Sequence, residues 1–428
     1  MKGKIKNFDD LAVTEERTIA LRIAEAGLAA IDTDTVVKKW IRKEEKVLYV
    51  GEEGIRLDRY KRLFVVGVGK CALKAGSVLE EILGDTITGG IVLDVHEGHL
   101  SRIKTYVGTH PYPSRENMVA TAEIISFLAG LSEKDLVIFA ISGGGSTLLC
   151  QPRNLEYAVE AELLKILFRE GAAIDEINVL RKHLSLARGG YLAACAYPAR
   201  VISLIFSDVP GDDMQYIASG PTVMDTTTID DAEKIIIKYD LEKRTELKIE
   251  LTETPKDPKY FRNVKNIIVV SNTIALHAME EEAKQSGFSP VIVTSALQGE
   301  AREVGVQVVQ KLHTASPKTA MLYGGETTVT IRGDGKGGRN QEVALGALGE
   351  LRSGELIVSL ASDGKDDSDY AGALCDTITK EKVEEMKLDS KQFLERNDSY
   401  HFFEQIGDML STGDTGSNVS DLIIALKQ

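Results

Sequence analysis

The chain has 428 residues, and its 51 Lys and Arg residues against 65 Asp and Glu residues give a formal net charge of −14. With 43% hydrophobic and 27% charged residues, it does not belong to the disordered or fibrous classes, and its length predicts two or three domains. The acidic balance repels nucleic acid and anionic membranes. A negatively charged ligand must therefore be held by local cations or backbone amides.

The cysteines and the apolar runs bear on the cellular compartment. Cys71, Cys150, Cys195 and Cys375 are far apart and form no C-x-x-C pair, so the sequence signals neither a disulfide framework nor a zinc site. The first 18 residues lack the apolar core of a signal peptide, and the longest apolar runs fall far below the roughly 18 residues of a membrane span. We expect a cytoplasmic protein with no membrane partner.

Alternating helices and apolar strands dominate the first half of the chain. Residues 14–40 have apolar positions at helical spacing and predict one helix. After Arg62, four short apolar runs alternate with helical stretches, which is typical of a parallel sheet covered on both faces. These predicted strands are Leu63–Val68, Gly90–Val95, Leu136–Ile141 and Val201–Phe206.

A second α/β region is expected after a charged segment at residues 241–263, which we interpret as the connection between domains. Gly-containing turns there favour a mixed sheet. The predicted architecture is α/β with two domains: a three-layer, mainly parallel domain at residues 1–255 and a smaller mixed-sheet domain at 256–428. The strands predicted for the second region are Ile267–Val270, Val291–Thr294, Met321–Tyr323, Thr327–Ile331, Leu356–Leu360 and a final strand after Asp421.

The first chemical motif is Val-Gly-Val-Gly-Lys, in which a strand runs into a glycine turn before a helix. Gly67 and Gly69 let the backbone approach an anion, and Lys70 adds a cation suited to phosphate or carboxylate oxygens. The same turn reads as the dinucleotide fingerprint G-x-G-x-x-A, with Asp94 as the ribose-binding acid. A nicotinamide-dependent dehydrogenase is therefore the natural rival.

The second motif is a run of glycines between two serines, directly after a predicted buried strand. Successive glycines flanked by hydroxyl donors form a concave set of N–H groups that suits a phosphate chain. A plain flexible turn is the alternative. The run is Ser142, Gly143, Gly144, Gly145 and Ser146.

Three carboxylates follow the strand Val201–Phe206 in the segment Ser-Asp-Val-Pro-Gly-Asp-Asp. Asp208 stands at the carboxyl end of that strand, where open α/β sheets bind ligands. With Asp212 and Asp213 it can hold Mg²⁺ against phosphate oxygens, or it can act as a base for a substrate hydroxyl. Ordinary turn chemistry also explains acids after Pro-Gly.

Basic and amide side chains fill the helical region between Gly171 and Gly190. Asn178 and Lys182 are four residues apart, as are Arg181 and Ser185, so polar groups stack on neighbouring faces. These side chains can bind an anionic substrate, although a solvated basic helix face is the default explanation for a run of basic residues.

The C-terminal half contributes three polar segments. In the first, glycines bracket Glu326 and Arg339, and an arginine leaving a glycine-rich loop can fork onto a carboxylate or phosphoryl group. The others follow or precede predicted strands and carry Asp363 and Asn418, which we expect to line a cleft wall. The seven histidines form no metal-binding motif and no evident cluster, and His96 and His99 are explained as solvated polar positions.

Taken in order, these segments resemble the type II glycerate kinases, a family with a Rossmann-like N-terminal domain and a C-terminal MOFRL domain. The resemblance covers nearly the whole chain, and several of its motifs are weak alone but specific in this order on both domains. The motifs are Val-Gly-Val-Gly-Lys, Ser-Gly-Gly-Gly-Ser, Asn-Val-Leu-Arg-Lys-His-Leu-Ser, Ser-Asp-Val-Pro-Gly-Asp-Asp, Ala-Ser-Gly-Pro-Thr, Gly-Gly-Glu-Thr-Thr-Val, Gly-Gly-Arg-Asn-Gln-Glu and Asp-Thr-Gly-Ser-Asn-Val-Ser-Asp.

The resemblance implies ATP-dependent, Mg²⁺-assisted phosphorylation of D-glycerate in a cleft between the domains, with 2-phosphoglycerate and ADP as products. It places the family's lysine on Lys70, its arginine on Arg339 and its aspartate on Asp208, which become the predicted catalytic residues. Asp208 and Asp212 are the predicted metal ligands. Residues 142–146 and Asn418 are predicted to bind the nucleotide, and Gly69, Arg181, Glu326 and Asp363 the substrate.

The expected mechanism is positioning and charge neutralisation around the transferred phosphoryl group, with domain closure before the chemistry. A monomer or homodimer acting on a small molecule is expected. Two alternatives stay open: the nicotinamide-dependent hydroxyacid dehydrogenase, and a non-catalytic ligand sensor.

Overall fold

The computed structural model describes residues 3–153, 155–209 and 211–428. The chain forms two compact units, each with its own α/β core. One unit spans Val36–Val269, and the other combines Met1–Thr35 with Val270–Gln428. We call them the central unit and the terminal unit. Within the described ranges, no helix combines the length and the apolar character that a membrane crossing needs.

The sheet of the central unit confirms the predicted mainly parallel architecture. Its six strands have the order β6-β5-β4-β7-β8-β9, and the pairs from β6 to β8 are all parallel. Each apolar run predicted before residue 210 coincides with one of these strands, although β5 ends at Asp94, one residue before the predicted end. The strands are β4 (Arg62–Val68), β5 (Ile87–Asp94), β6 (Lys104–Val107), β7 (Asp135–Ser142), β8 (Arg200–Phe206) and β9 (Val264–Val270).

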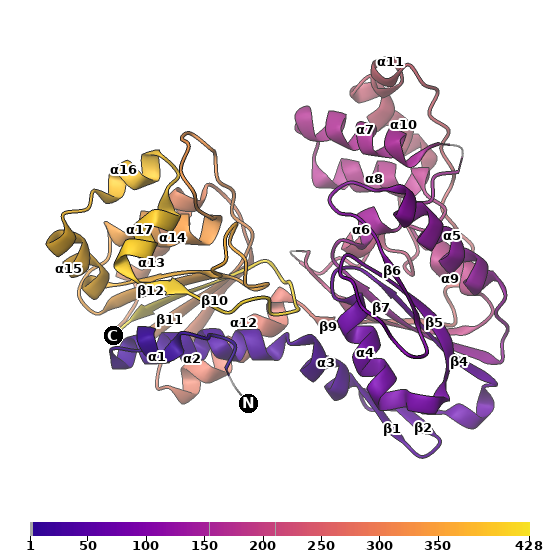
Figure 1. The fold of residues 1–428 in the computed structure, drawn as a ribbon, viewed down its shortest axis with the longest axis horizontal. Helices are drawn as coiled ribbons and strands as arrows, with labels where there is room; N and C mark the ends of the chain where they lie inside the picture. The colour runs from indigo at the N-terminus through magenta and orange to yellow at the C-terminus, as the bar shows by residue number, and fades with distance from the viewer. Residues whose placement is uncertain (1–2, 154, 210) are drawn as a thin grey trace. The chain divides into compact units, whose positions relative to one another are not determined.

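Helices cover both faces of this sheet because its strands are apolar on both sides. Phe64, Val66 and Val68 pack with α5 and α9 on one face, whereas α4 packs on the other. A helical cluster of α7, α8, α10 and α11 has a core of its own (Figure 1). The helices are α3 (Thr33–Trp40), α4 (Ala72–Leu83), α5 (Arg115–Ala129), α6 (Gly145–Leu148), α7 (Tyr157–Arg169), α8 (Ile174–Leu184), α9 (Tyr191–Ala196), α10 (Ile229–Lys238) and α11 (Leu241–Thr245). A small antiparallel sheet joins β1 (Ile41–Glu44), β2 (Val47–Val50) and β3 (Glu53–Arg56).

The terminal unit has the predicted mixed sheet, with strand order β10-β11-β15-β12-β13-β14. The pair β10–β11 is parallel, and the remaining pairs are antiparallel. The C-terminal strand β15 therefore lies in the middle of the sheet, between β11 and β12. The strands are β10 (Ser289–Leu297), β11 (Thr319–Gly325), β12 (Glu355–Ala361), β13 (Gly372–Cys375), β14 (Met409–Leu410) and β15 (Asp421–Lys427).

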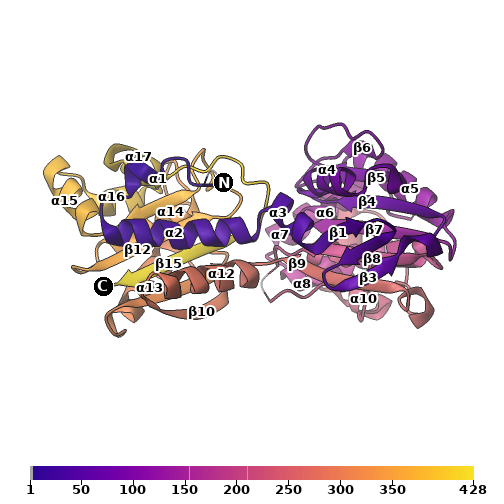
Figure 2. The same cartoon turned by 90° about the horizontal axis from the view of Figure 1, so that it is seen from below.

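The first helices of the chain cover one face of this sheet. α2 packs alongside α12, as Figures 1 and 2 both show, and a Cβ at Gly27 of α2 would lie 2.8 Å from Met279 Cγ of α12. The opposite face packs on α13, α14 and α17. The helices are α1 (Phe8–Leu11), α2 (Glu15–Ala30), α12 (Asn272–Gln285), α13 (Ala301–His313), α14 (Arg339–Leu348), α15 (Thr377–Met386), α16 (Ser390–Glu395) and α17 (Ser399–Ile406).

The structure corrects the predicted boundaries. Residues 1–35 belong to the terminal unit and not to a domain at 1–255, because the apolar face of α2 is buried on α12 and the sheet of that unit. The segment 241–263 lies inside the central unit and is not the connection between domains. β9, predicted as the first strand of the second region, is instead an edge strand of the central sheet.

Two predicted elements are also wrong. The helix expected at 14–40 is two helices, because the Asp32 carboxylate accepts hydrogen bonds from the Thr35 amide and hydroxyl, both at 2.8 Å, and starts a new helix there. Thr327–Ile331 is not a strand; only an isolated bridge joins Thr328 to Glu300. Its five consecutive β-branched residues lack a neighbouring strand with which to form a ladder.

Arg17 attaches α2 to the rest of the terminal unit through a buried ion cluster. Its guanidinium donates to Asp376 at 2.7 Å and to Asp408 at 2.9 Å, and the arginine is 1% exposed. Thr379 also donates to Asp408, at 2.7 Å. Lys382 Nζ also lies 2.8 Å from Asp408, so removal of the guanidinium would leave buried Asp376 without its cation and Asp408 with Lys382 alone.

We therefore expect Arg17→Met to lower the free energy of unfolding of the terminal unit by about 3–5 kcal/mol, measured by urea denaturation of the full chain. The matched control is Arg22→Met on the same helix, because the Arg22 side chain is 54% exposed in its pair with Glu282. This control should cost less than about 1 kcal/mol. Equal losses in the two variants would contradict the role given to the Arg17 cluster.

Candidate active site

Two glycine turns meet at one edge of the central sheet because β4 and β7 are parallel neighbours. The turn after β4 and the turn after β7 are joined by two hydrogen bonds: Lys70 N donates to Gly143 O at 2.9 Å, and Cys71 N donates to Ser142 Oγ at 3.2 Å. Gly69 has a φ of +123°, and a Cβ there would clash with Ser142. The close approach of the turns therefore needs glycine at residue 69.

A cation and a carboxylate lie over the glycines of the second turn. A Cβ at Gly144 would be 3.0 Å from Lys70 Cγ, and a Cβ at Gly143 would clash with the Asp208 carboxylate. Asp208 follows β8, the strand next to β7. The structure thus brings together Lys70, residues 142–146 and Asp208, which the sequence analysis selected from segments about 70 residues apart. Each glycine makes room for one functional side chain.

His110 also lies beside this turn, and the sequence analysis did not find it. Its Cδ2 is 3.5 Å from the Cβ position of Gly144. Burial, together with the positive charges of Lys70 and Arg181, lowers the pKa of His110 to about 4. Buried Asn117 of α5 holds the loop by accepting from Thr109 N at 2.8 Å and donating to Thr147 O at 3.1 Å. The imidazole is therefore neutral and lies within the field of two cations.

Helix α8 is not a solvated basic face. Arg181 is 8% exposed, and its Nη2 lies 3.4 Å from Thr147 Oγ1, one residue beyond Ser146. Its Nε has no hydrogen-bond partner among the described residues. Burial lowers the pKa of Arg181 to about 10, with a further contribution from Arg188. Buried Glu160, whose charge acts on Arg181, pairs with Arg188 at 2.6 Å, so Arg181 is a buried cation with capacity to bind an anion.

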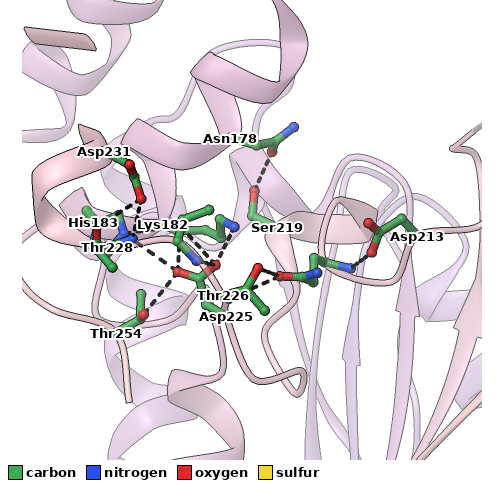
Figure 3. Close-up of polar contacts among 12 residues, drawn as sticks. Asn178, Lys182, His183, Asp213, Ser219, Asp225, Thr226, Thr228, Asp231 and Thr254 are labelled. Carbon is green, nitrogen blue, oxygen red and sulfur yellow. Dashed lines mark hydrogen bonds and ion pairs between the residues drawn. The ribbon is translucent and has the colours of Figure 1, made fainter. Parts of the chain in front are cut away.

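The two residues of α8 that follow Arg181, Lys182 and His183, belong to a buried polar network (Figure 3). Lys182 Nζ lies 2.5 Å from Asp225 Oδ1, and both side chains are almost fully buried. The other Asp225 oxygen accepts from Thr254 Oγ1 at 3.0 Å and lies 3.6 Å from His183 Nε2. Burial raises the pKa of Asp225, but the hydrogen bond and charge of Lys182 outweigh it, so the net pKa lies below the ordinary value. This network fixes the helix that carries Arg181.

The predicted acidic cluster after β8 is only partly formed. Asp213 accepts from Gln215 N at 2.9 Å within its own turn, and Asp212 has a left-handed φ of +58°. Across residues 3–153, 155–209 and 211–428, no group of three or more His, Cys, Asp or Glu side chains is placed to hold a metal ion. Asp208 is thus the carboxylate of this loop that lies at the glycine turn.

In the terminal unit, Arg339 opens α14 and is paired with carboxylates. Its Nε donates to Asp421 at 2.7 Å and its Nη1 to Glu326 at 2.6 Å. Asn340 Nδ2 bridges Asp366 and Asp421 at 3.1 and 2.8 Å. Burial raises the pKa of Asp366 to about 7 and that of Asp421 to about 6, although Arg339 opposes the latter shift. Arg339 and Glu326, both predicted site residues, are therefore direct partners.

Asp363 and Asn418 lie in adjacent loops because β12 and β15 are antiparallel neighbours. The Asp363 carboxylate accepts from Lys365 N at 2.9 Å, and Asn418 Oδ1 accepts from Ser420 N at 2.9 Å. Both side chains thus make turn hydrogen bonds that stabilise their own loops.

The proximity of His110 to Lys70 gives a measurable consequence. In Lys70→Met, the pKa of His110 should rise above about 4, because one nearby positive charge is lost, but stay below 6.5 because burial remains. An NMR titration of the imidazole measures both values. Lys134→Met, at the opposite end of β7, should leave the His110 pKa unchanged; an unchanged value in Lys70→Met as well would contradict the geometry.

Two family models match the chain. A model described as a domain of unknown function, DUF4147, matches residues 19–252, and the MOFRL family model matches residues 319–421. A "Glycerate 2-kinase" of Pyrococcus horikoshii is 36% identical, with the alignment covering 96% of this chain and 97% of the relative. The crystal structure of a glycerate kinase from Thermotoga maritima superposes with a TM-score of 0.83 at 33% identity and covers 96% of this chain and 99% of that one.

Two similar sequences have a different name. A relative from Agrobacterium vitis, provisionally named a hydroxypyruvate reductase, is 36% identical, with 84% of this chain and 86% of the relative covered. That name bears on the dehydrogenase alternative, which requires Asp94 to bind a ribose. In this structure, Asp94 is buried and accepts from Leu73 N at 2.8 Å, Val95 N at 2.6 Å and His96 Nδ1 at 2.9 Å. Both of its oxygens are used within the fold.

Proposed function

We propose that this chain, which belongs to the glycerate kinase family, transfers the γ-phosphoryl group of ATP to the 2-hydroxyl of D-glycerate and releases 2-phosphoglycerate and ADP. Family membership supports glycerate phosphorylation; the nucleotide and the position of the phosphoryl group are the proposal. The observation that carries it is the pair of cations at the second glycine turn. Lys70 lies over Gly144, and buried Arg181 reaches Thr147 three residues further on.

Both proposed substrates are anions, and the turn offers a group for each. Neither Lys70 nor Arg181 forms a hydrogen-bonded ion pair with a carboxylate in the parts of the chain that the structure describes. We assign Arg181 to the glycerate carboxylate, because a planar guanidinium matches two oxygens. Lys70 is assigned to the phosphates. The first backbone N–H groups of α6, at Gly145 and Ser146, have no acceptor within the helix and are assigned to the phosphates as well.

Asp208 is the proposed metal ligand and Asp212 the weaker second one. Mg²⁺ commonly binds through one or two carboxylates together with substrate phosphates, so a single carboxylate at the turn fits that pattern. When bound, the ion would neutralise charge on the phosphate oxygens. Asp208 is also assigned to orient the acceptor hydroxyl, because little covalent chemistry is required of the protein in phosphoryl transfer. The roles expected for Gly69, Arg339, Glu326, Asp363 and Asn418 stay predictions.

The direct test is to incubate the protein with ATP, Mg²⁺ and D-glycerate and to follow the products by phosphorus NMR. We expect ADP and a phosphomonoester on C2. A phosphomonoester on C3 would contradict the proposed position, and no glycerate-dependent ADP would contradict the kinase proposal. NADH formation from glycerate and NAD⁺ without ATP would instead support the dehydrogenase, which the occupied oxygens of Asp94 disfavour.

Lys70→Ala should lower kcat/KM for D-glycerate at least about 100-fold, because a preorganised charge at a transferring phosphoryl group is worth about 10²–10³ in rate. Steady-state kinetics measure the loss. Lys134→Ala removes an exposed lysine from the far end of β7 and should leave kcat/KM unchanged. A Lys70→Ala value within threefold of the wild type would contradict the assigned role.

A further inference from the structure

Two buried arginines, Arg181 and Arg188, share the neighbourhood of one buried carboxylate, that of Glu160. Arg188 and Glu160 are 0% and 1% exposed, and Arg188 Nη2 lies 2.6 Å from Glu160 Oε1. Burial and the charge of Arg188 lower the pKa of Arg181, and the charge of Glu160 opposes them. A single carboxylate therefore acts on both cations, and the cation that does not pair with it remains available to a ligand.

The turn that follows α8 brings Arg188 back onto Arg181. Gly189 has a left-handed φ of +56°, and its N–H donates to Ser219 O at 2.8 Å. A Cβ at Gly189 would lie 3.3 Å from Lys182 Cβ, so the turn packs directly on the helix. Arg188 Nη1 donates to Arg181 O at 3.2 Å, and that carbonyl belongs to the last turn of α8, where carbonyls lack partners within the helix. Arg188 therefore caps α8 at the backbone of Arg181.

Glu160, in α7, depends on Arg188 for its charge compensation. Its second oxygen, Oε2, accepts from the Cys150 thiol at 3.5 Å, and a thiol is a weak donor. Burial raises the pKa of Cys150, so the thiol stays protonated and brings no charge. Among the described residues, Arg188 is the only cation that forms an ion pair with Glu160. Without Arg188, the remaining buried cation on which the Glu160 charge acts is Arg181.

From this geometry we propose that Arg188 is a positioning residue for substrate binding: by pairing with Glu160, it leaves the Arg181 guanidinium without a protein counterion and open to the substrate carboxylate. The inference rests on the proposed function, in which Arg181 binds the carboxylate of glycerate. Arg181 Nη2 has only the Thr147 hydroxyl at 3.4 Å, and Arg181 Nε has no partner among the described residues. The guanidinium thus keeps donors for a bound anion.

The two members of the ion pair should have opposite effects on substrate binding. Removal of Arg188 makes Glu160 a competitor of the substrate, because a carboxylate that neutralises Arg181 weakens the attraction for a second one. Removal of the Glu160 charge takes the competitor away. In Glu160→Gln, the amide oxygen still accepts from Arg188, so the cap of α8 is retained. A merely structural ion pair predicts instead that either change weakens binding, since each change breaks the pair.

The test is to measure binding of D-glycerate to the full chain by calorimetry, without nucleotide. Arg181→Met should weaken binding at least about 30-fold, as expected when one partner of a buried charge pair is removed. Arg188→Met should weaken it about ten-fold or more, because the Arg181 charge is then partly neutralised. Glu160→Gln should bind at least as tightly as the wild type. The double variant Arg188→Met/Glu160→Gln should return to within about threefold of the wild type, because the two residues act as a unit.

The matched control is Arg62→Met, which removes the cation of another buried carboxylate in the central unit. Arg62 lies at the start of β4, and its Nη2 is 2.7 Å from Asp135, which is 1% exposed. Because this pair is at the end of the sheet opposite the glycine turns, D-glycerate binding should be unchanged.

The outcomes separate the inference from the proposed function. Weaker binding in Glu160→Gln, no recovery in the double variant, or unchanged binding in Arg188→Met would each overturn the inference. If Arg188→Met does not fold, Glu160→Gln decides: binding at least as tight as in the wild type supports the inference, and weaker binding overturns it. Unchanged binding in Arg181→Met would overturn the assignment of Arg181 in the proposed function and the inference with it. The expected binding pattern together with no ADP formation in the kinase assay would overturn only the kinase proposal.

Discussion

The parallel pairing of β4 with β7 is the constraint on which the site depends. It places the ends of two strands side by side, and the hydrogen bonds from Lys70 N and Cys71 N to the second turn hold the two loops together. At that separation no side chain fits at Gly69. The same crowding forces Lys70 and Asp208 to pass over glycines, so the backbone geometry of the turns determines where the charges lie.

Three buried basic side chains in and just after α8 differ in how their charges are compensated. Lys182 is neutralised by Asp225, and Arg188 by Glu160. Arg181 is left with a threonine hydroxyl and an unpartnered Nε. Because a buried charge without a counterion is costly, an anion bound beside Arg181 would stabilise the folded protein.

Much of this arrangement was predictable from sequence where the signal is local. Apolar runs followed by glycine turns predicted β4 and β7 and the convergence of their loops, because strand ends in a parallel sheet share an edge. Where partners are distant in sequence, prediction failed. α2 looks like any amphipathic helix, and only the structure shows that Arg17 attaches it to Asp376 and Asp408.

His110 and Asp225 were missed for a related reason. His110 reaches the turn only because Asn117, in a helix that follows it, holds the loop at Thr109 and Thr147. Asp225 has no motif of its own, and its importance comes from the lysine it neutralises across 43 residues. The strand wrongly predicted at Thr327–Ile331 shows the opposite error. Local β propensity was present there, but no neighbouring strand completes a ladder.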